Sequence, residues 1–292
     1  MLRLEWIVLF FFCSSLTAQD GAWTRHTIDN SSRGADGVRF LDVNGDGLED
    51  IATGWEEGGL IRIYLHPGYK KVTDRWPLAT VGRVKSPEDA VFCDLDRDGA
   101  VDVVSCCEGG NRKVFAHWAP SGKGKYLEAA AWKTLSFPVV DNKTQWMFAL
   151  PMELDGAAGV DLVVGAKGPG ACVGWLRSPP AARDMRAWTF HSWYQAGWIM
   201  SLISHDVDGD GDIDVVVSDR KGKKPGVLWL ENPGRKAVSE NPGLAWREHR
   251  MGASGKEVLF VSLYDLDGDG RKEAAVTAKP NRVILLYPGG DP

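Results

Sequence analysis

Short runs in which apolar and polar residues alternate recur along this chain, separated by turns rich in glycine and aspartate. The first set comprises VRFLDV at 38–43, DIATGW at 50–55, IRIYLHP at 61–67 and RWPLATV at 75–81. A hydrophobic period of two predicts β-strands rather than helices. The chain is therefore expected to build units of four short strands.

The four-strand set returns three more times before a shortened fifth copy. The copies begin at AVFCDL, FALPMEL, LISHDV and VSLYDL, and the last one ends after its third strand, RVILLYPG. Four-stranded units that stack on their neighbours, with glycine-rich turns and regularly placed aromatic residues, are typical of a β-propeller. The predicted fold is all-β, a single β-propeller.

A tryptophan marks the fourth strand of each unit. Trp23, Trp76, Trp132, Trp188 and Trp246 follow one another at intervals of 53, 56, 56 and 58 residues. The first of them precedes the first unit, and the fifth unit has no fourth strand of its own. The sequence therefore predicts five four-stranded blades, closed by the N-terminal strand AWTRHTI at 22–28.

Four acidic loops follow the first strand of a unit: DVNGDGLED at 42–50, DLDRDGAVD at 94–102, DVDGDGDID at 206–214 and DLDGDGRKE at 265–273. Each places oxygen-bearing side chains at positions 1, 3, 5 and 9 and glycine at position 6, which suits a hard cation that prefers six to eight oxygen ligands. An EF-hand would need a glutamate at position 12 and flanking helices, but this position holds Thr53, Ser105, Val217 or Val276 between strands. We therefore expect about four calcium ions in strand-flanked loops.

With these loops, residues 19–292 resemble the FG-GAP and VCBS repeat proteins, the integrin-alpha-like calcium-loop repeats. The resemblance implies that side chains at positions 1, 3, 5 and 9 and the carbonyl at position 7 are the ligands. In order along the chain these are Asp42, Asn44, Asp46, Leu48 and Asp50; Asp94, Asp96, Asp98, Ala100 and Asp102; Asp206, Asp208, Asp210, Asp212 and Asp214; and Asp265, Asp267, Asp269, Arg271 and Glu273.

A fifth loop, ELDGAAGVD at 153–161, departs from this pattern. Positions 5 and 6 are Ala157 and Ala158, so a carboxylate and a glycine are missing. We expect this loop to hold no ion.

Composition limits the function classes. The 292 residues have no linker long enough to divide the repeats, and the net charge of −5 with a pI near 5.7 argues against a nucleic-acid-binding surface. Beyond the leader, four cysteines form neither a disulfide framework nor a zinc pattern.

The N-terminus reads as an export signal. Arg3 precedes the apolar run WIVLFFFCSSL, and small residues end at Ala18, so residues 1–18 are expected to be a signal peptide and 19–292 the propeller. Phe12 disfavours lipid attachment at Cys13. The predicted protein is a monomer without a membrane span, secreted, periplasmic or associated with the cell envelope.

The rim opposite the acidic loops carries the candidate ligand face. Its residues are drawn from the loops between second and third strands and from the segments that lead into each first strand: Asp36, Glu88, Trp146, Lys167, Trp198, Arg220 and Lys279. Tryptophans beside charged groups are typical of surfaces that bind sugars, so a polysaccharide or an extracellular protein is the expected partner. Two alternatives stay open. The tryptophans can pack between blades, or Glu88 with Asp36 can be the paired carboxylates of a carbohydrate-active enzyme, a lyase or a glycoside hydrolase.

Overall fold

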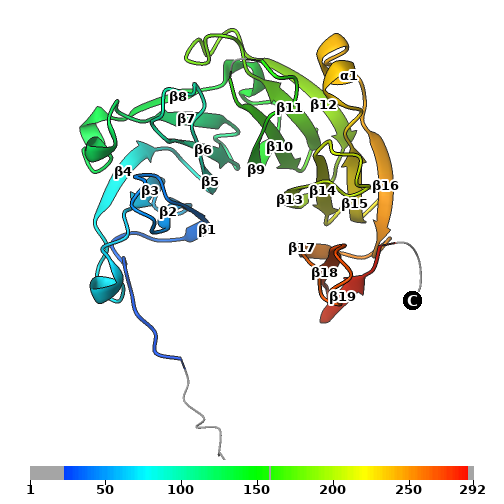
Figure 1. Cartoon of the computed structure of the whole chain (residues 1–292), viewed down its shortest axis with the longest axis horizontal. Coiled ribbons are helices and arrows are strands. Elements are labelled where there is room, and N and C mark those ends of the chain that lie inside the picture. The colour runs from blue at the N-terminus through cyan, green and yellow to red at the C-terminus, as the bar shows by residue number, and fades with distance from the viewer. Residues whose placement is uncertain (1–22, 158, 289–292) are drawn as a thin grey trace, which may run out of the picture.

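In the computed structural model, residues 23–157 and 159–288 are described. They form nineteen strands in five antiparallel sheets, arranged as an arc around a common centre (Figure 1). Sheet 1 contains β1 (Ala35–Leu41), β2 (Asp50–Trp55), β3 (Leu60–Tyr64) and β4 (Leu78–Arg83). Sheet 2 contains β5 (Pro87–Cys93), β6 (Asp102–Cys107), β7 (Val114–Trp118) and β8 (Lys133–Ser136).

The other three sheets repeat this order. Sheet 3 contains β9 (Gln145–Met152), β10 (Asp161–Lys167), β11 (Cys172–Arg177) and β12 (Thr189–Gln195). Sheet 4 contains β13 (Ile199–His205), β14 (Asp214–Asp219), β15 (Gly226–Glu231) and β16 (Arg247–Gly252), with the short helix α1 (Arg235–Glu240) before β16. Sheet 5 contains β17 (Val258–Tyr264), β18 (Glu273–Ala278) and β19 (Arg282–Leu286).

Each sheet is a meander in which consecutive strands pair. Because the strands are antiparallel, the connection after a first strand and the connection after a second strand lie at opposite ends of the sheet. We call the end with the acidic loops the loop rim. The other end, formed by the hairpins between second and third strands and by the segments leading into the first strands, is the hairpin rim.

The core lies between neighbouring sheets, since the second strand of each full sheet is buried along its whole length or nearly so. The predicted tryptophans recur in this core: Trp76, Trp132, Trp188 and Trp246 are all buried. Trp188 meets Phe137 of the preceding sheet edge to face at 4.8 Å, and Trp246 stacks on Trp193 at 4.1 Å. The repeat therefore explains most of the packing between sheets, as the alternating pattern predicted.

The closure of the ring by the N-terminal strand is not seen. Sheet 5 has three strands, residues 23–28 form no strand, and the Trp23 side chain is 99% exposed. Asp29 fastens the segment to sheet 1 by accepting hydrogen bonds from Arg62 and from the Tyr64 hydroxyl (2.8 Å). Ile28 still packs on sheet 1, whereas residues 23–27 are exposed, and the arc is open between β1 and sheet 5 (Figure 1).

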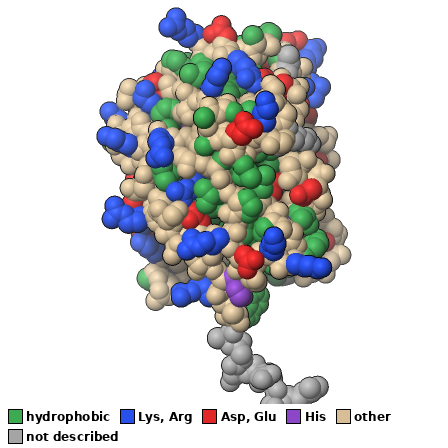
Figure 2. Space-filling model, turned by 90° about the vertical axis from the view of Figure 1, so that its left-hand side faces the viewer, with side chains coloured by type: hydrophobic (Ala, Val, Ile, Leu, Met, Phe, Trp, Pro, Cys, Tyr) green, Lys and Arg blue, Asp and Glu red, His purple; other side chains and the backbone are tan. Residues whose placement is uncertain are grey.

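Other expectations concern the cysteines, the membrane and the leader. Cys93, Cys106, Cys107 and Cys172 are buried free thiols. Within residues 23–157 and 159–288, no helix has the length and apolar content to cross a bilayer. The predicted signal peptide at 1–18 lies outside the described residues. Figure 2 shows the outer edge of the arc on the left of Figure 1, where Lys and Arg are scattered among acidic and apolar side chains.

Candidate functional site

The four acidic loops share one backbone shape, held by the side chain at position 1. Asp206 accepts hydrogen bonds from the N–H groups of Gly209 (2.8 Å) and Gly211 (3.1 Å), and Asp265 does the same with the glycines at the equivalent positions. The position-5 carboxylate of each loop accepts from the N–H of position 7, at 2.8 to 2.9 Å. Oxygen side chains are thereby gathered around one point in every loop.

The left-handed backbone conformation at positions 4 and 6 makes this shape possible. Position 6 is glycine in all four loops, with φ between +83° and +95°. Position 4 is also left-handed and is glycine in three loops, but the second loop has Arg97 there with φ +59°. A side chain in this region is strained, which makes the second loop different from the others.

The side chain at position 9 also has a structural role, which its spacing in the sequence does not reveal. The carboxylate of Asp102 is fully buried and accepts hydrogen bonds from the N–H of Leu95 (3.2 Å) and of Ala119 (2.7 Å), just after the third strand. Asp50, Asp161 and Asp214 repeat the arrangement in sheets 1, 3 and 4. Burial raises the pKa of Asp102 to about 8 and those of Asp161 and Asp214 to about 6.

The donor set fits calcium. Three carboxylates come within 4.8 Å of one another in the second, fourth and fifth loops, through Asp94, Asp96 and Asp102; Asp206, Asp208 and Asp210; and Asp265, Asp267 and Asp269. The first loop has Asn44 at position 3, so it offers an amide oxygen in place of one carboxylate. An ionised carboxylate has about four lone-pair positions, so the position-9 group can accept two N–H donors and still face a cation.

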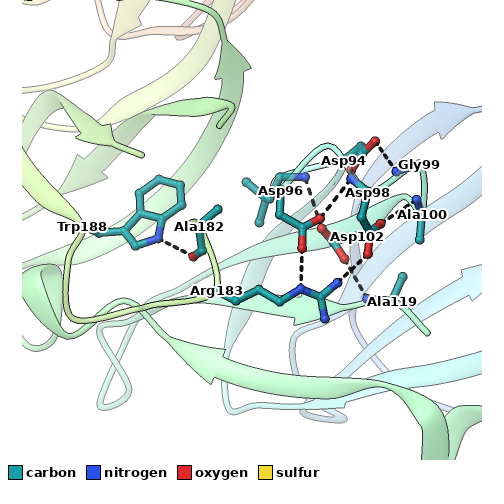
Figure 3. Close-up of polar contacts among 11 residues, drawn as sticks. Asp94, Asp96, Asp98, Gly99, Ala100, Asp102, Ala119, Ala182, Arg183 and Trp188 are labelled. Carbon is teal, nitrogen blue, oxygen red and sulfur yellow. Dashed lines mark hydrogen bonds and ion pairs between the residues drawn. The ribbon is translucent and has the colours of Figure 1, made fainter. Parts of the chain in front are cut away.

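An arginine from the next sheet reaches the second loop (Figure 3). Arg183, in the connection between β11 and β12, donates to the carboxylates of Asp96 and Asp98 (2.9 Å for Asp98), and its guanidinium lies 4.9 Å from the Trp118 ring centre. A positive charge therefore already compensates two of the four acidic side chains in this loop.

Arginines also compensate the degenerate third loop. Arg97 pairs with Glu153 at position 1, and Arg177 pairs with Asp155 at position 3 through a 2.6 Å hydrogen bond. The Asp155 side chain is almost fully buried by this contact. Guanidinium groups therefore supply positive charge to both acidic side chains at positions 1 and 3 of this loop.

On the hairpin rim, six of the seven candidate ligand-face residues form a continuous series. Lys167 pairs with Glu88 (3.4 Å), which lies close enough to Asp36 for their charges to interact. Lys167 and Arg220 lie over the Trp198 ring, at 4.8 and 4.4 Å from its centre.

The series continues into sheet 5 through Glu257. This carboxylate accepts from Arg220 (2.7 Å) and pairs with Lys279 (3.7 Å). Charged groups from all five sheets thus meet on one rim.

Two further residues of this group, Glu56 and Glu108, were missed in the sequence. Glu108 pairs with Lys167, and oxygens of Glu56, Glu88 and Glu108 lie within 4.8 Å of one another. The signal that could have found them is repeat register. Glu56, Glu108, Lys167, Arg220 and Lys279 each stand six residues after position 9 of their loop.

This series of contacts divides by charge. Sheets 1 and 2 contribute carboxylates, and burial together with the nearby Glu88 charge raises the pKa values of Asp36 and Glu56. Sheets 3 to 5 contribute mainly cations.

Trp146 does not belong to the ligand face. Its side chain is 0% exposed, its indole N–H donates to the Val140 carbonyl (3.2 Å), and Phe190 meets it edge to face at 5.6 Å. The reason is strand alternation: Trp146 pairs with Ala166 in the sheet and points to the core face. For this residue the packing alternative is correct.

Trp198 is half-buried and is held by its backbone. The buried carboxylate of Asp219 accepts hydrogen bonds from the N–H groups of Gly197 (3.1 Å) and Trp198 (2.9 Å) and from the Tyr194 hydroxyl (3.0 Å). Gly197 is required here because a Cβ would lie 1.9 Å from the Lys221 carbonyl oxygen. The hairpin of sheet 4 consequently packs directly against the turn that carries Trp198.

Comparison with known families identifies the repeats. The profile of the FG-GAP-like repeat matches residues 42–105 and 206–276, which contain the first, second, fourth and fifth acidic loops. No curated protein sequence matches the chain.

Similar solved structures include an Agrocybe aegerita lectin that recognises non-reducing terminal N-acetylglucosamine (15% identity, TM-score 0.48), the V. cholerae biofilm matrix protein Bap1 (17%, 0.42) and a putative phosphatase from Bacteroides thetaiotaomicron (13%, 0.49). The alignments cover 82%, 87% and 84% of this chain but 60%, 37% and 58% of those chains. At these identities and TM-scores, the three structures carry no information about what this chain binds.

Proposed function

We propose that this chain, an FG-GAP repeat protein, is an exported binding module in which calcium is structural and the hairpin rim holds a glycan or an extracellular protein. The observation that supports it is the unbroken series of contacts from Asp36 through Lys167 and Trp198 to Lys279. Charged side chains are costly to fix in place unless they are paired or bind a partner. Five sheets contribute to this one arrangement, so it offers a ligand one continuous charged surface.

Calcium has a different place in this proposal. Four loops would hold an ion through the side chains at positions 1, 3, 5 and 9 and the carbonyl at position 7, and the third loop would hold none. The ion would neutralise carboxylates that repel one another within a single turn. Because the loops lie on the loop rim, we assign them to stability rather than to ligand contact.

The proposal places residues 1–18 in a cleaved export signal and the propeller in residues 19–292, acting as a monomer outside the cytoplasm. Calcium is abundant there, and loops of modest affinity stay loaded.

The finer architecture, a ring completed by residues 22–28, is part of the same proposal. A cavity of about 850 Å³ between sheets 4 and 5 is lined by Met251, Trp229 and Leu286. In sheets 2 and 3, the residue five positions after the sheet's own tryptophan contacts the tryptophan of the next sheet: Phe137 contacts Trp188, and Trp193 contacts Trp246. In sheet 4, the residue five positions after Trp246 is Met251. By this register Trp23 belongs beside Met251, in the cavity, with its strand along β19.

A carbohydrate-active enzyme is the second candidate. The favouring observation is the group of Glu56, Glu88 and Glu108 with Lys167 among them, since paired carboxylates carry out glycoside hydrolysis. Lys167 neutralises two of these carboxylates, however, so none is singled out as the acid or the base. We therefore prefer binding.

A glycan and protein interaction screen in calcium-containing buffer tests the proposal. The wild-type protein should retain at least one ligand, and Lys167→Ala with Arg220→Ala should lose it while circular dichroism and cooperative unfolding show that the variant keeps the native fold. A matched pair on the loop rim, Lys70→Ala with Lys71→Ala, should bind normally. Retention by the rim variant would place the site elsewhere, and cleavage of a retained glycan would favour the enzyme.

A further inference from the structure

Cations are concentrated on one part of the hairpin rim. The rim segments of sheets 3, 4 and 5 carry eight of them, Lys143 and Lys224 together with six that we call the basic arc: Lys167, Arg220, Lys221, Lys223, Lys256 and Lys279. The protein as a whole has a net charge of −5, so this concentration runs against its composition. A local excess of one charge in an oppositely charged protein indicates a surface that attracts a partner.

Contacts between sheets 4 and 5 hold the arc together. The N–H of Gly255 donates to the Pro225 carbonyl at 2.9 Å, and Glu257 joins Arg220 to Lys279. The hairpin with Lys221 and Lys223 therefore lies beside the turn with Lys256.

The cations greatly outnumber the acids that face them. Lys167 and Arg220 pair with Glu88, Glu108 and Glu257, whereas Lys221, Lys223 and Lys256 are exposed and make no ion pair within the described part of the chain. Three ammonium groups without an ion pair, beside one shared carboxylate, leave the arc short of negative charge.

Trp198 orders these cations instead of offering a face to a sugar. Lys167, Arg220 and Lys221 lie at 4.8, 4.4 and 5.0 Å from its ring centre. An indole attracts cations through its negative face, so the ring brings three like charges close together. With its surroundings occupied in this way, and with Trp146 in the core, the rim has little to offer a neutral sugar by stacking.

We infer that the basic arc is a binding site for an acidic polysaccharide, one that carries carboxylate or sulfate groups, and this inference rests on the proposed binding function. Guanidinium and ammonium groups bind such anions through charge-assisted hydrogen bonds. The carboxylates Glu56, Glu88 and Glu108 on the adjoining part of the rim can accept hydrogen bonds from sugar hydroxyls. An acidic polysaccharide offers both kinds of group in one chain.

The same division of charge disfavours nucleic acid. Duplex DNA carries a negative charge about every 1.7 Å along its axis and has few free hydroxyls. A duplex laid along the arc would meet the carboxylates of sheets 1 and 2, whereas a polysaccharide can offer them hydroxyl donors.

The test measures binding of dextran sulfate, hyaluronate, unsulfated dextran and a double-stranded DNA oligonucleotide to the calcium-loaded protein. We expect both acidic polysaccharides to bind, the neutral dextran to show no binding, and DNA to bind at least tenfold more weakly. Binding of the polysaccharides should weaken steeply between about 50 and 200 mM salt, as charge-driven association does.

Two variants with equal charge change make the test specific to the arc. Lys221→Gln/Lys223→Gln/Lys256→Gln removes three exposed cations and should raise the dissociation constant for dextran sulfate at least tenfold. Lys70→Gln/Lys71→Gln/Lys236→Gln removes three exposed cations on the loop rim and should leave it within twofold. Equal effects of the two triples, or DNA binding as tight as dextran sulfate binding, would overturn the inference.

The outcomes separate this inference from the function on which it rests. If neutral glycans or proteins bind the hairpin rim and acidic polysaccharides do not, the binding module stands and the acidic ligand is wrong. If nothing tested binds this rim, both are wrong.

Discussion

The carboxylate of Asp102 accepts a 2.7 Å hydrogen bond from the backbone N–H of Ala119, which lies 17 residues further along the chain. It also accepts from Leu95 at 3.2 Å, so one buried side chain joins the start of the acidic loop to the end of the third strand. Asp161 makes the same pair of hydrogen bonds in the loop whose acids are compensated by arginine, so we expect this role not to depend on calcium. Position 9 is thus a structural link in its own right.

Substitutions in the second and third loops should separate this link from calcium binding. Asp102→Ala and Asp161→Ala each leave two backbone N–H groups without their acceptor, at a cost of about 2–5 kcal/mol, in chelator as well as in calcium. Asp98→Ala, at the exposed position 5, removes surface contacts with the Ala100 N–H and Arg183, so it should cost little in chelator and clearly more when calcium is present. Denaturant unfolding with and without chelator measures both. A loss for Asp161→Ala that appears only in calcium would contradict the assignment.

Arg183 should compete with calcium in the second loop. Arg183→Gln removes the guanidinium from Asp96 and Asp98, so calcium affinity of that loop should rise, by roughly tenfold if the competing interaction amounts to about 1.4 kcal/mol. Isothermal titration of chelator-treated protein measures the change. Arg186→Gln is the matched control, since Arg186 is an exposed cation in the same connection. A lower affinity in the Arg183 variant would show that the arginine helps to hold the ion.

The sequence predicted the repeated strands and the acidic loops because both depend on local spacing. Side-chain alternation sets a strand, and glycine at position 6 permits the φ near +90° that each loop requires. The FG-GAP family assignment follows from the same residues and is confirmed by the family profile. The strands and the acidic loops are therefore determined by residues within a single unit.

The remaining features depend on which residues of different units meet. Arg183 reaches a loop 85 residues earlier in the chain, and no periodicity signals this contact. Trp146 lies in the segment of several residues before its loop, which spans both faces of a strand, and sequence position alone does not show that this side chain points to the core. Glu56 and Glu108 stand six residues after position 9 of their loops, as Lys167 does, so aligning the repeats on position 9 identifies them.

A buried histidine makes stability depend on pH. His117 is 0% exposed, lies between Ser105 Oγ (2.9 Å) and Thr134 Oγ1 (2.8 Å), and packs against Gly82 of sheet 1. Burial lowers its pKa to about 3. The unfolded chain therefore binds more protons than the folded chain below about pH 6.5, and stability falls as pH falls through this window.

The expected loss from His117 at pH 5 is about 2 kcal/mol relative to pH 7. His117→Gln keeps a polar side chain between the two hydroxyls but cannot titrate. The difference in unfolding free energy between pH 7 and pH 5, measured in chelator so that calcium binding does not contribute, should be smaller in the variant by this amount. Equal pH dependence in the two proteins would mean that His117 is not buried in its neutral form.

Substitution of Trp23 tests whether residues 22–28 close the ring. As an exposed side chain it should tolerate Trp23→Ala with a change in unfolding free energy within about 0.5 kcal/mol. As the missing tryptophan of sheet 5, placed in the cavity beside Met251, it should cost about 3–5 kcal/mol, as Trp188→Ala should in sheet 3. We expect the larger value.

Deleting residues 19–28 should then expose the β19 edge and cause aggregation or loss of cooperative unfolding. Light scattering of the full-length protein tells whether residues 22–28 close the ring of their own chain or that of a second copy, because only exchange between two copies gives a dimer. A truncated protein that stays monomeric and equally stable would establish that sheet 5 is complete with three strands.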